Sequence, residues 1–246
     1  MKLSPQTVIY AIDLFGTASF AFSGALRVLD KRPDFVGMLI LASATAVGGS
    51  VLRDVILNRD VMLLRDWGYP LAILFATLMT FFFPGSVARR QNIFKYFDAI
   101  GIGVFSAITA SVAWSTTPTI NPLSILMIAC ITGCAGGVIR DLMAGKTTLI
   151  LSNELYVTPI IFGAAGLMIV QSVGGSTLAG FFTAMLVATG IRVLAIRFNW
   201  RLPRLIDHEQ LPDETTSTQT LIADRSAHEN NESPGQEKGR GRPLAR

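Results

Sequence analysis

Long apolar stretches separated by short polar connections dominate the chain. A helix that spans a membrane needs about 20 mostly apolar residues, and seven stretches reach or approach this length. Almost every charged residue lies at the end of a stretch, whereas a soluble helical protein needs polar faces on its surface helices. The pattern predicts an all-α membrane protein with seven transmembrane helices. The expected spans are residues 8–27, 35–52, 67–83, 96–114, 123–139, 155–171 and 177–196.

One pattern of residues occurs twice in these stretches. The first copy has Asp13 in the first stretch and ends the second stretch with Gly48-Gly49-Ser50, followed by Arg53-Asp54. The second copy has Asp98 in the fourth stretch. It ends the fifth stretch with Ala135-Gly136-Gly137, followed by Arg140-Asp141. The spacing from the first Asp to the Arg is 40 residues in one copy and 42 in the other.

An aromatic residue three positions before a proline follows each copy, from Trp67 to Pro70 and from Tyr156 to Pro159. We interpret these shared landmarks as a duplication. The transmembrane domain is then residues 1–206, with one repeat at 8–83, a second at 96–171 and a seventh helix at 177–196. Residues 207–246 are polar and poor in aromatic side chains, so we expect a disordered cytoplasmic tail.

The distribution of Lys and Arg predicts the orientation in the membrane. If the N-terminus is outside, most of these residues lie on the cytoplasmic side, and the outer side holds only Lys2, Arg53, Arg59 and Arg65. We therefore expect the N-terminus outside and the C-terminus in the cytoplasm. Since each repeat has three helices, the second repeat must be inverted relative to the first.

Adjacent glycines in a spanning helix favour a kink. A kink frees backbone carbonyls, which a bilayer tolerates only where they are buried in protein or line a wet cavity. Helices two and five are therefore expected to be broken at Gly48, Gly49, Ser50 and at Ala135, Gly136, Gly137, with the carbonyls lining an ion path. The other interpretation is close helix packing through small residues.

Ionisable residues inside a membrane are candidates for function. Asp13 and Asp98 are the most apolar-embedded acids of the chain, and each would attract cations or pair with an arginine. Arg53-Asp54 and Arg140-Asp141 are either gating groups beside the kinks or structural ion pairs at the helix ends, and the sequence leaves both interpretations open.

Composition excludes several other functions. Both histidines, His208 and His228, lie in the polar tail, and no cluster with metal-ligand spacing is present. No nucleophile or phosphate-binding motif of an enzyme occurs, so we expect neither an enzyme nor a cofactor. The basic residues form no stripe or face of the kind that binds nucleic acid.

The doubled motif resembles the bacterial members of the trimeric intracellular cation (TRIC) channel family, which is also labelled as a family of glycine transporters. The resemblance covers about residues 5–200. It implies a homotrimer in membrane lipids, with an ion path in each protomer for monovalent cations, mainly K⁺, and Na⁺ as a second candidate. The Lys-Glu-Val motif of the animal members is missing from residues 98–105, so their gating is not implied.

Two other functions remain open at this level. Inverted repeats around a site at the middle of the membrane are equally the architecture of a secondary transporter, here for a small zwitterion such as glycine. The third possibility is a structural membrane protein whose glycines serve only packing between subunits.

Overall fold

The structure is a computed structural model of the 246-residue chain, and it describes residues 4–84, 93–116 and 120–202. The expected cytoplasmic tail, residues 207–246, lies outside the described residues. Within the described ranges the protein is all-helical, and the β pairing found there is one isolated bridge between Glu154 and Arg201.

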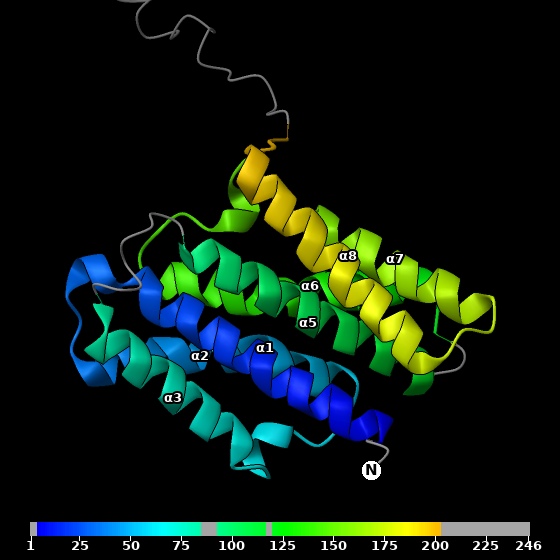
Figure 1. Ribbon diagram of the computed structural model, residues 1–246, viewed down its shortest axis with the longest axis horizontal. Coiled ribbons are helices and arrows are strands. Elements are labelled where there is room, and N and C mark those ends of the chain that lie inside the picture. The colour runs from blue at the N-terminus through cyan, green and yellow to red at the C-terminus, as the bar shows by residue number, and fades with distance from the viewer. Residues whose placement is uncertain (1–3, 85–92, 117–119, 203–246) are drawn as a thin grey trace, which may run out of the picture. The chain divides into compact units, whose positions relative to one another are not determined.

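The described residues form seven α-helices, as the hydropathy pattern predicts (Figure 1). Five of them are long and apolar enough to span a membrane, and α3 and α7 are shorter apolar helices of 15 residues each. Short 3-10 turns follow three of the helices: η1 (Leu29–Lys31), η2 (Met62–Leu64) and η3 (Leu149–Leu151). The helices are α1 (Pro5–Arg27), α2 (Phe35–Ile56), α3 (Gly68–Phe82), α5 (Ile93–Thr116), α6 (Pro122–Met143), α7 (Thr158–Ser172) and α8 (Thr177–Phe198).

The helix starts follow from local sequence. Ser4, Asp34, Asn121 and Ser176 each accept a hydrogen bond from a backbone N–H of the first turn, which satisfies a donor that the helix itself leaves free. The ends of α2 and α6 differ from the prediction. Each continues one turn beyond the apolar stretch, so the Arg-Asp pairs lie inside the last helical turns, where buried partners compensate their charges.

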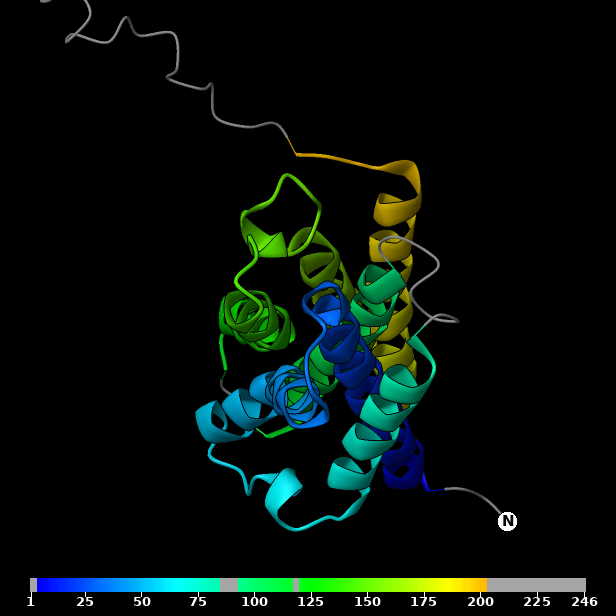
Figure 2. The same cartoon turned by 90° about the vertical axis from the view of Figure 1, so that its left-hand side faces the viewer.

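Helices α1 and α5 lie side by side at the centre of the bundle, and α5 is the more deeply buried of the two (Figure 1). Helices α2 and α6 pack against each other beside this pair, and Figure 2 shows both of them nearly end-on. Helix α3 packs on α1, whereas α7 and α8 pack on each other and on α5. Each repeat therefore contributes one helix to each of the two central pairs.

Glycines let α2 and α6 cross closely. A Cβ atom on Gly49 would overlap the carbonyl oxygen of Thr132, and a Cβ atom on Gly136 would overlap the carbonyl oxygen of Thr45. The two contacts are reciprocal: the glycine of each helix meets a threonine carbonyl of the other. The later residue of α2 meets the earlier residue of α6, so the two helices are antiparallel where they touch. Both helices are continuous through their glycines. The break expected there is therefore not a break in helical structure: the missing Cβ atoms permit backbone contact between α2 and α6.

The same reciprocity relates α1 and α5. Phe20 and Phe105 are buried counterparts whose ring centroids lie 5.0 Å apart in edge-to-face geometry. Phe105 lies against Gly49, and Phe20 lies against Gly136. Paired contacts between equivalent residues of two copies are the pattern that a two-fold axis produces.

Candidate functional site

The first cluster consists of Asp13, Arg53, Asp54 and Tyr69, all buried. The Tyr69 hydroxyl donates a hydrogen bond of 2.8 Å to Asp13 Oδ2, and Arg53 Nε donates one of 2.8 Å to Asp54 Oδ1. The N–H of Met62 reaches Asp54 Oδ2 at 3.4 Å. This cluster connects α1, α2 and α3 inside the first repeat.

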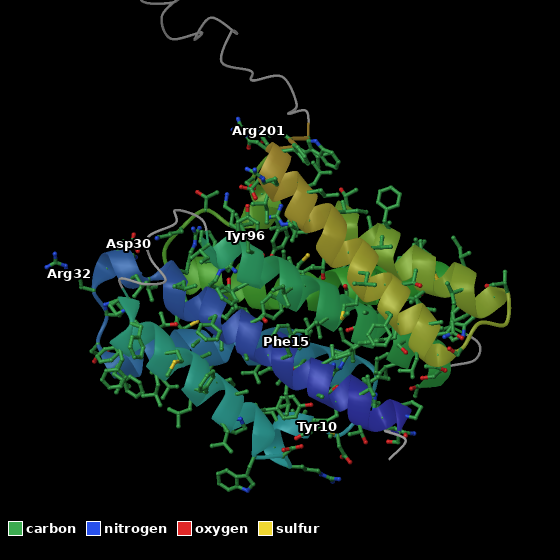
Figure 3. The ribbon with its side chains drawn as sticks, in the orientation of Figure 1. Tyr10, Phe15, Asp30, Arg32, Tyr96 and Arg201 are labelled. Carbon is green, nitrogen blue, oxygen red and sulfur yellow. The ribbon has the colours of Figure 1, made fainter. Side chains whose placement is uncertain are left out.

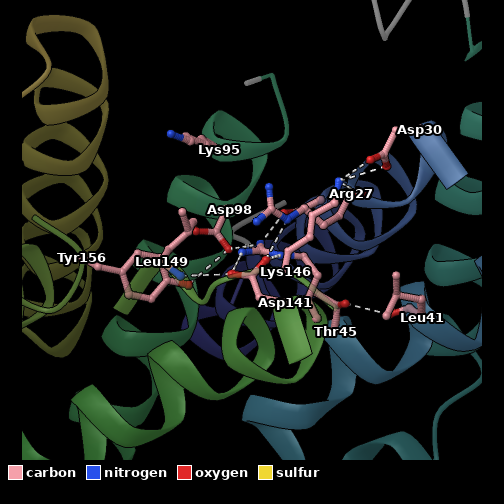
Figure 4. A network of polar contacts seen from close by, with 12 residues as sticks. Arg27, Asp30, Leu41, Thr45, Lys95, Asp98, Asp141, Lys146, Leu149 and Tyr156 are labelled. Atoms are coloured by element: carbon pink, nitrogen blue, oxygen red, sulfur yellow. Dashed lines mark hydrogen bonds and ion pairs between the residues drawn. The ribbon is translucent and has the colours of Figure 1, made fainter. Parts of the chain in front are cut away.

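The second cluster consists of Asp98, Arg140, Asp141 and Tyr156, and it is buried as completely. Figure 4 shows Asp98, Asp141 and Tyr156 close together in this cluster. Arg140 Nη1 donates to Asp98 Oδ1 at 2.5 Å, and its Nε and Nη2 each donate to Asp141 at 3.1 Å. The Tyr156 hydroxyl donates to Asp98 Oδ1 at 3.3 Å, and the N–H of Leu149 donates to Asp141 Oδ2 at 3.1 Å.

The two clusters are copies of one arrangement. Each joins an Asp of the first helix, an Arg-Asp pair of the second helix and a Tyr that precedes or begins the third. In both clusters, a backbone N–H of the 3-10 turn after the second helix donates a hydrogen bond to Oδ2 of the Asp in the Arg-Asp pair. The sequence analysis identified both Asp residues and both Arg-Asp pairs, and the structure brings each set together within its own repeat.

The partners of the two clusters differ. In the second cluster, Ser23 accepts a hydrogen bond of 2.7 Å from Arg140 Nη1, and Arg27 Nε donates one of 2.8 Å to Asp141 Oδ1. In the first cluster, Arg53 Nη1 and Asp13 Oδ1 are buried without a hydrogen-bond partner, and the two side chains form no ion pair within 4.0 Å. Asp98 Oδ2 of the second cluster is also buried without a hydrogen-bond partner. The clusters differ in their ion pairs, because Arg140 pairs with both Asp98 and Asp141, whereas Arg53 pairs with Asp54.

A cavity of about 1000 Å³ opens onto the first cluster. It is bounded by the start of α1, the end of α5 and the start of α8, and Asp13, Arg53 and Asp54 all line it. Tyr10, at the cavity, lies near the amino end of α1, and Asp30 lies just beyond the other end of that helix (Figure 3). Lys146 binds Asp30 and the carbonyl of Arg27 beside the second cluster. The two clusters therefore lie toward opposite ends of α1.

A third charged group joins α8 to the second repeat. Arg192 of α8 is fully buried, and it donates to Glu154 Oε2 and to the carbonyl of Leu155, at 2.8 and 2.9 Å. Lys95 also binds Glu154. Burial alone would raise the pKa of Glu154, but the hydrogen bonds from Lys95 and Arg192 outweigh it and hold this pKa below its ordinary value.

The remaining predicted residues surround the crossing of α2 and α6. Gly48 faces Ile139 and Gly136, while Gly137 faces Tyr156 and Asp98. Ser50 is buried with its hydroxyl bonded to a carbonyl of its own helix, and Ala135 is half-buried. The doubled motif therefore contributes contacts between helices and to the clusters, with Gly49 and Gly136 at its centre.

Three contributors to the clusters were not identified from the sequence: Tyr69, Ser23 and Arg27. The aromatic spacing aligned Trp67 with Tyr156, but the structure pairs Tyr69 with Tyr156, and Trp67 is 81% exposed. The number of residues from the Arg-Asp pair to the tyrosine is the same in both copies, and this spacing aligns Tyr69 with Tyr156 correctly. Ser23 and Arg27 come from the other repeat, so no spacing within one copy indicates them.

A family model described as a glycine transporter matches residues 10–84 and 95–172. Each matched range corresponds to one copy of the repeat. The chain belongs to this family. A relative from Vibrio cholerae, named a UPF0126 membrane protein, is 33% identical over 207 residues, which are 80% of this chain and 82% of that protein. With the apolar helices, this relationship identifies a multi-pass membrane protein of the glycine-transporter family.

Solved structures resemble this family member over nearly their whole length. One from work on conductance through TRIC cation channels is 31% identical with a TM-score of 0.71, covering 79% of this chain and 96% of that chain. The TRIC orthologue from Rhodobacter sphaeroides is 29% identical with a TM-score of 0.72, covering 79% of this chain and all of that chain. The resemblance to bacterial TRIC channels is thereby confirmed, since both solved proteins are described as TRIC channels.

Proposed function

We propose that the protein is a channel for monovalent cations, mainly K⁺, with one ion path through each protomer. The two buried charged clusters, one toward each end of the central α1/α5 pair, carry this proposal. Ionisable groups inside a membrane are costly and mark ion pathways. The solved relatives, described as TRIC cation channels, support the same function.

The path would run from the cavity past Asp13 and Arg53, through the crossing of α2 and α6, to Asp98 and Arg140. At the crossing, the carbonyls of Thr45 and Thr132 lie against the facing glycines, and Phe20 and Phe105 fill the space beside them. Conduction then requires α2 and α6 to separate or bend here. Such a movement would expose backbone carbonyls, which can replace part of the hydration shell of an ion.

The proposed assembly is a homotrimer in the bacterial inner membrane, surrounded by lipid. Large apolar side chains exposed on the protomer, such as Phe15, Ile40 and Leu186, are consistent with contacts to lipid or to neighbouring subunits. In the proposed orientation the N-terminus is outside, which places the first cluster toward the outer face and the second toward the cytoplasm.

Recordings from the purified protein in a planar bilayer test this function. With KCl at unequal concentrations on the two sides, we expect discrete current steps that reverse near the equilibrium potential of K⁺. The family description favours a second candidate, a glycine transporter. Saturable glycine uptake into vesicles, without current steps, would support that candidate and contradict the channel.

A further inference from the structure

The two clusters differ at positions where one repeat contacts the other, and this difference reveals the chemistry of the cavity. Along α1 and α5, equivalent residues are 85 positions apart, as with Asp13 and Asp98 or Phe20 and Phe105. Both helices are continuous over these positions, so the same offset applies to every residue between and beyond them up to the helix ends. It identifies the counterpart of each residue that completes the second cluster.

The residues that hold Arg140 and Asp141 have apolar counterparts at the first cluster. Ser23, which accepts from Arg140, corresponds to Ile108. Arg27, which donates to Asp141, corresponds to Val112. Ile108 and Val112 both line the cavity. The cavity therefore lies on the first cluster in the place where Ser23 and Arg27 lie on the second.

The aromatic neighbour of Arg27 follows the same rule. The guanidinium carbon of Arg27 lies 4.4 Å from the centre of the Phe94 ring, a cation–π contact. The counterpart of Phe94 is Ile9, which also lines the cavity. Arg27 and the two side chains that accompany it on the second cluster, Ser23 and Phe94, thus have aliphatic counterparts at the first cluster.

The replacement leaves the buried charges unequal. At the second cluster the carboxylates of Asp98 and Asp141 face the guanidiniums of Arg140 and Arg27. At the first cluster the buried guanidinium of Arg53 pairs with Asp54, and Asp13 has no ion pair, so with both carboxylates ionised one negative charge is in excess. Arg59 at the cavity is exposed to solvent and forms no ion pair among the described residues, so it compensates this charge weakly.

A buried charge without a partner is costly, and an ion that binds there relieves the cost. Asp13 is 6% exposed, and its buried Oδ1 has no hydrogen-bond partner, as is also true of Asp98 Oδ2 on the second cluster. The clusters differ at Asp54 Oδ1, which lacks the second donor that Arg27 gives Asp141 Oδ1. We propose that the cavity holds a monovalent cation at Asp54 Oδ1, in the position that the Arg27 guanidinium occupies at Asp141 Oδ1, with Asp13 of the same cavity adding negative charge. Arg27 is then a tethered cation that fills the equivalent site.

This inference rests on the proposed function in that the bound ion is the permeant one, but binding is measurable without conduction. The probe is K⁺ itself, added to the purified full-length protein in detergent against a large organic cation at constant ionic strength. A ligand that binds only the folded state raises the unfolding midpoint as its concentration rises. We expect the wild-type midpoint to rise with K⁺ concentration.

Two substitutions exchange the arginine and the valine between the equivalent positions 27 and 112, and two more serve as controls. Val112→Arg places a guanidinium beside Asp54, and it should abolish the K⁺-dependent shift and reduce unitary conductance at least tenfold. Val112→Met, of similar length but uncharged, should keep the shift. Arg27→Val removes the tethered cation and should enlarge the shift, because a second site becomes available. Asp13→Asn should weaken the shift while keeping the contact with Tyr69, and it tests the site if Val112→Arg fails to fold.

The outcomes separate the two proposals. A wild-type midpoint that ignores K⁺, or a Val112→Arg protein that keeps the full shift, overturns the cation site. If the shifts follow the expected pattern but no variant or wild-type protein conducts, the site stands and the channel function falls. If wild-type protein conducts and Val112→Arg conducts equally, the site is not on the ion path, and the inference fails.

Discussion

The close crossing of α2 and α6 makes a prediction for Gly136→Ala. The added Cβ would overlap the carbonyl oxygen of Thr45, which belongs to a helix backbone and cannot rotate away. Overpacking of this kind costs about 1–3 kcal/mol, while replacing a helical glycine by alanine gains about 1 kcal/mol. We therefore expect the free energy of unfolding to fall by up to about 2 kcal/mol.

Gly190→Ala in α8 is the matched control, because an added Cβ there would meet no atom within 4 Å. Only the helix-propensity gain remains, so this variant should be as stable as wild type or more stable by up to about 1 kcal/mol. Reversible unfolding by SDS in mixed micelles measures both. Equal stability of the two variants would refute the packing role of Gly136. Wild-type stability of Gly136→Ala combined with lost conductance would instead support helix bending as the role of this glycine.

Three further predictions follow from the charged groups. Arg140→Met should destabilise the protein by about 3–5 kcal/mol, because it leaves Asp98 without its cation, whereas Arg53→Met should cost less because the cavity reaches Asp13 and Asp54; SDS unfolding compares the two. The pKa of Glu154 is lower in the folded protein than in the unfolded chain, where it is about 4.3. Its contribution to stability is therefore fully present above about pH 4.3 and is lost as the pH falls through the lower folded pKa. Glu154→Gln should lack this loss in unfolding curves measured from pH 7 to 3. A reporter active only in the cytoplasm should be active when fused after Leu202 and silent when inserted at residue 117, and the reverse pattern would contradict the orientation.

Much of the fold was predictable from the sequence because the membrane imposes a length on apolar stretches. The seven helices and the duplication follow from hydropathy and from the repeated Asp and Arg-Asp positions. The continuity of α2 and α6 did not follow, since glycine pairs suit both a kink and a close crossing. The structure decides by placing the backbone of one helix against the glycine of the other.

The clusters were predictable only in part. The Asp and Arg-Asp residues repeat with nearly equal spacing, so they stand out. Arg27 does not stand out, because it repeats nowhere: its counterpart is Val112, and its partner Asp141 is 114 positions away. The repeated residues are visible in the sequence of each copy, whereas the contact between Arg27 and Asp141 depends on how the two copies pack. That contact is what makes the two clusters different.

A cysteine introduced at Ser111 tests most directly whether each protomer carries its own cation path. Ser111 lines the cavity, whereas Phe15 is exposed on the surface of the protomer. In a background without Cys130 and Cys134, a positively charged methanethiosulfonate reagent is added during a K⁺ recording. Modification of Ser111→Cys should reduce the current in three equal steps, one for each protomer, and Phe15→Cys should be unaffected. A single step, or a current that is insensitive at Ser111→Cys, would contradict a separate path through each protomer.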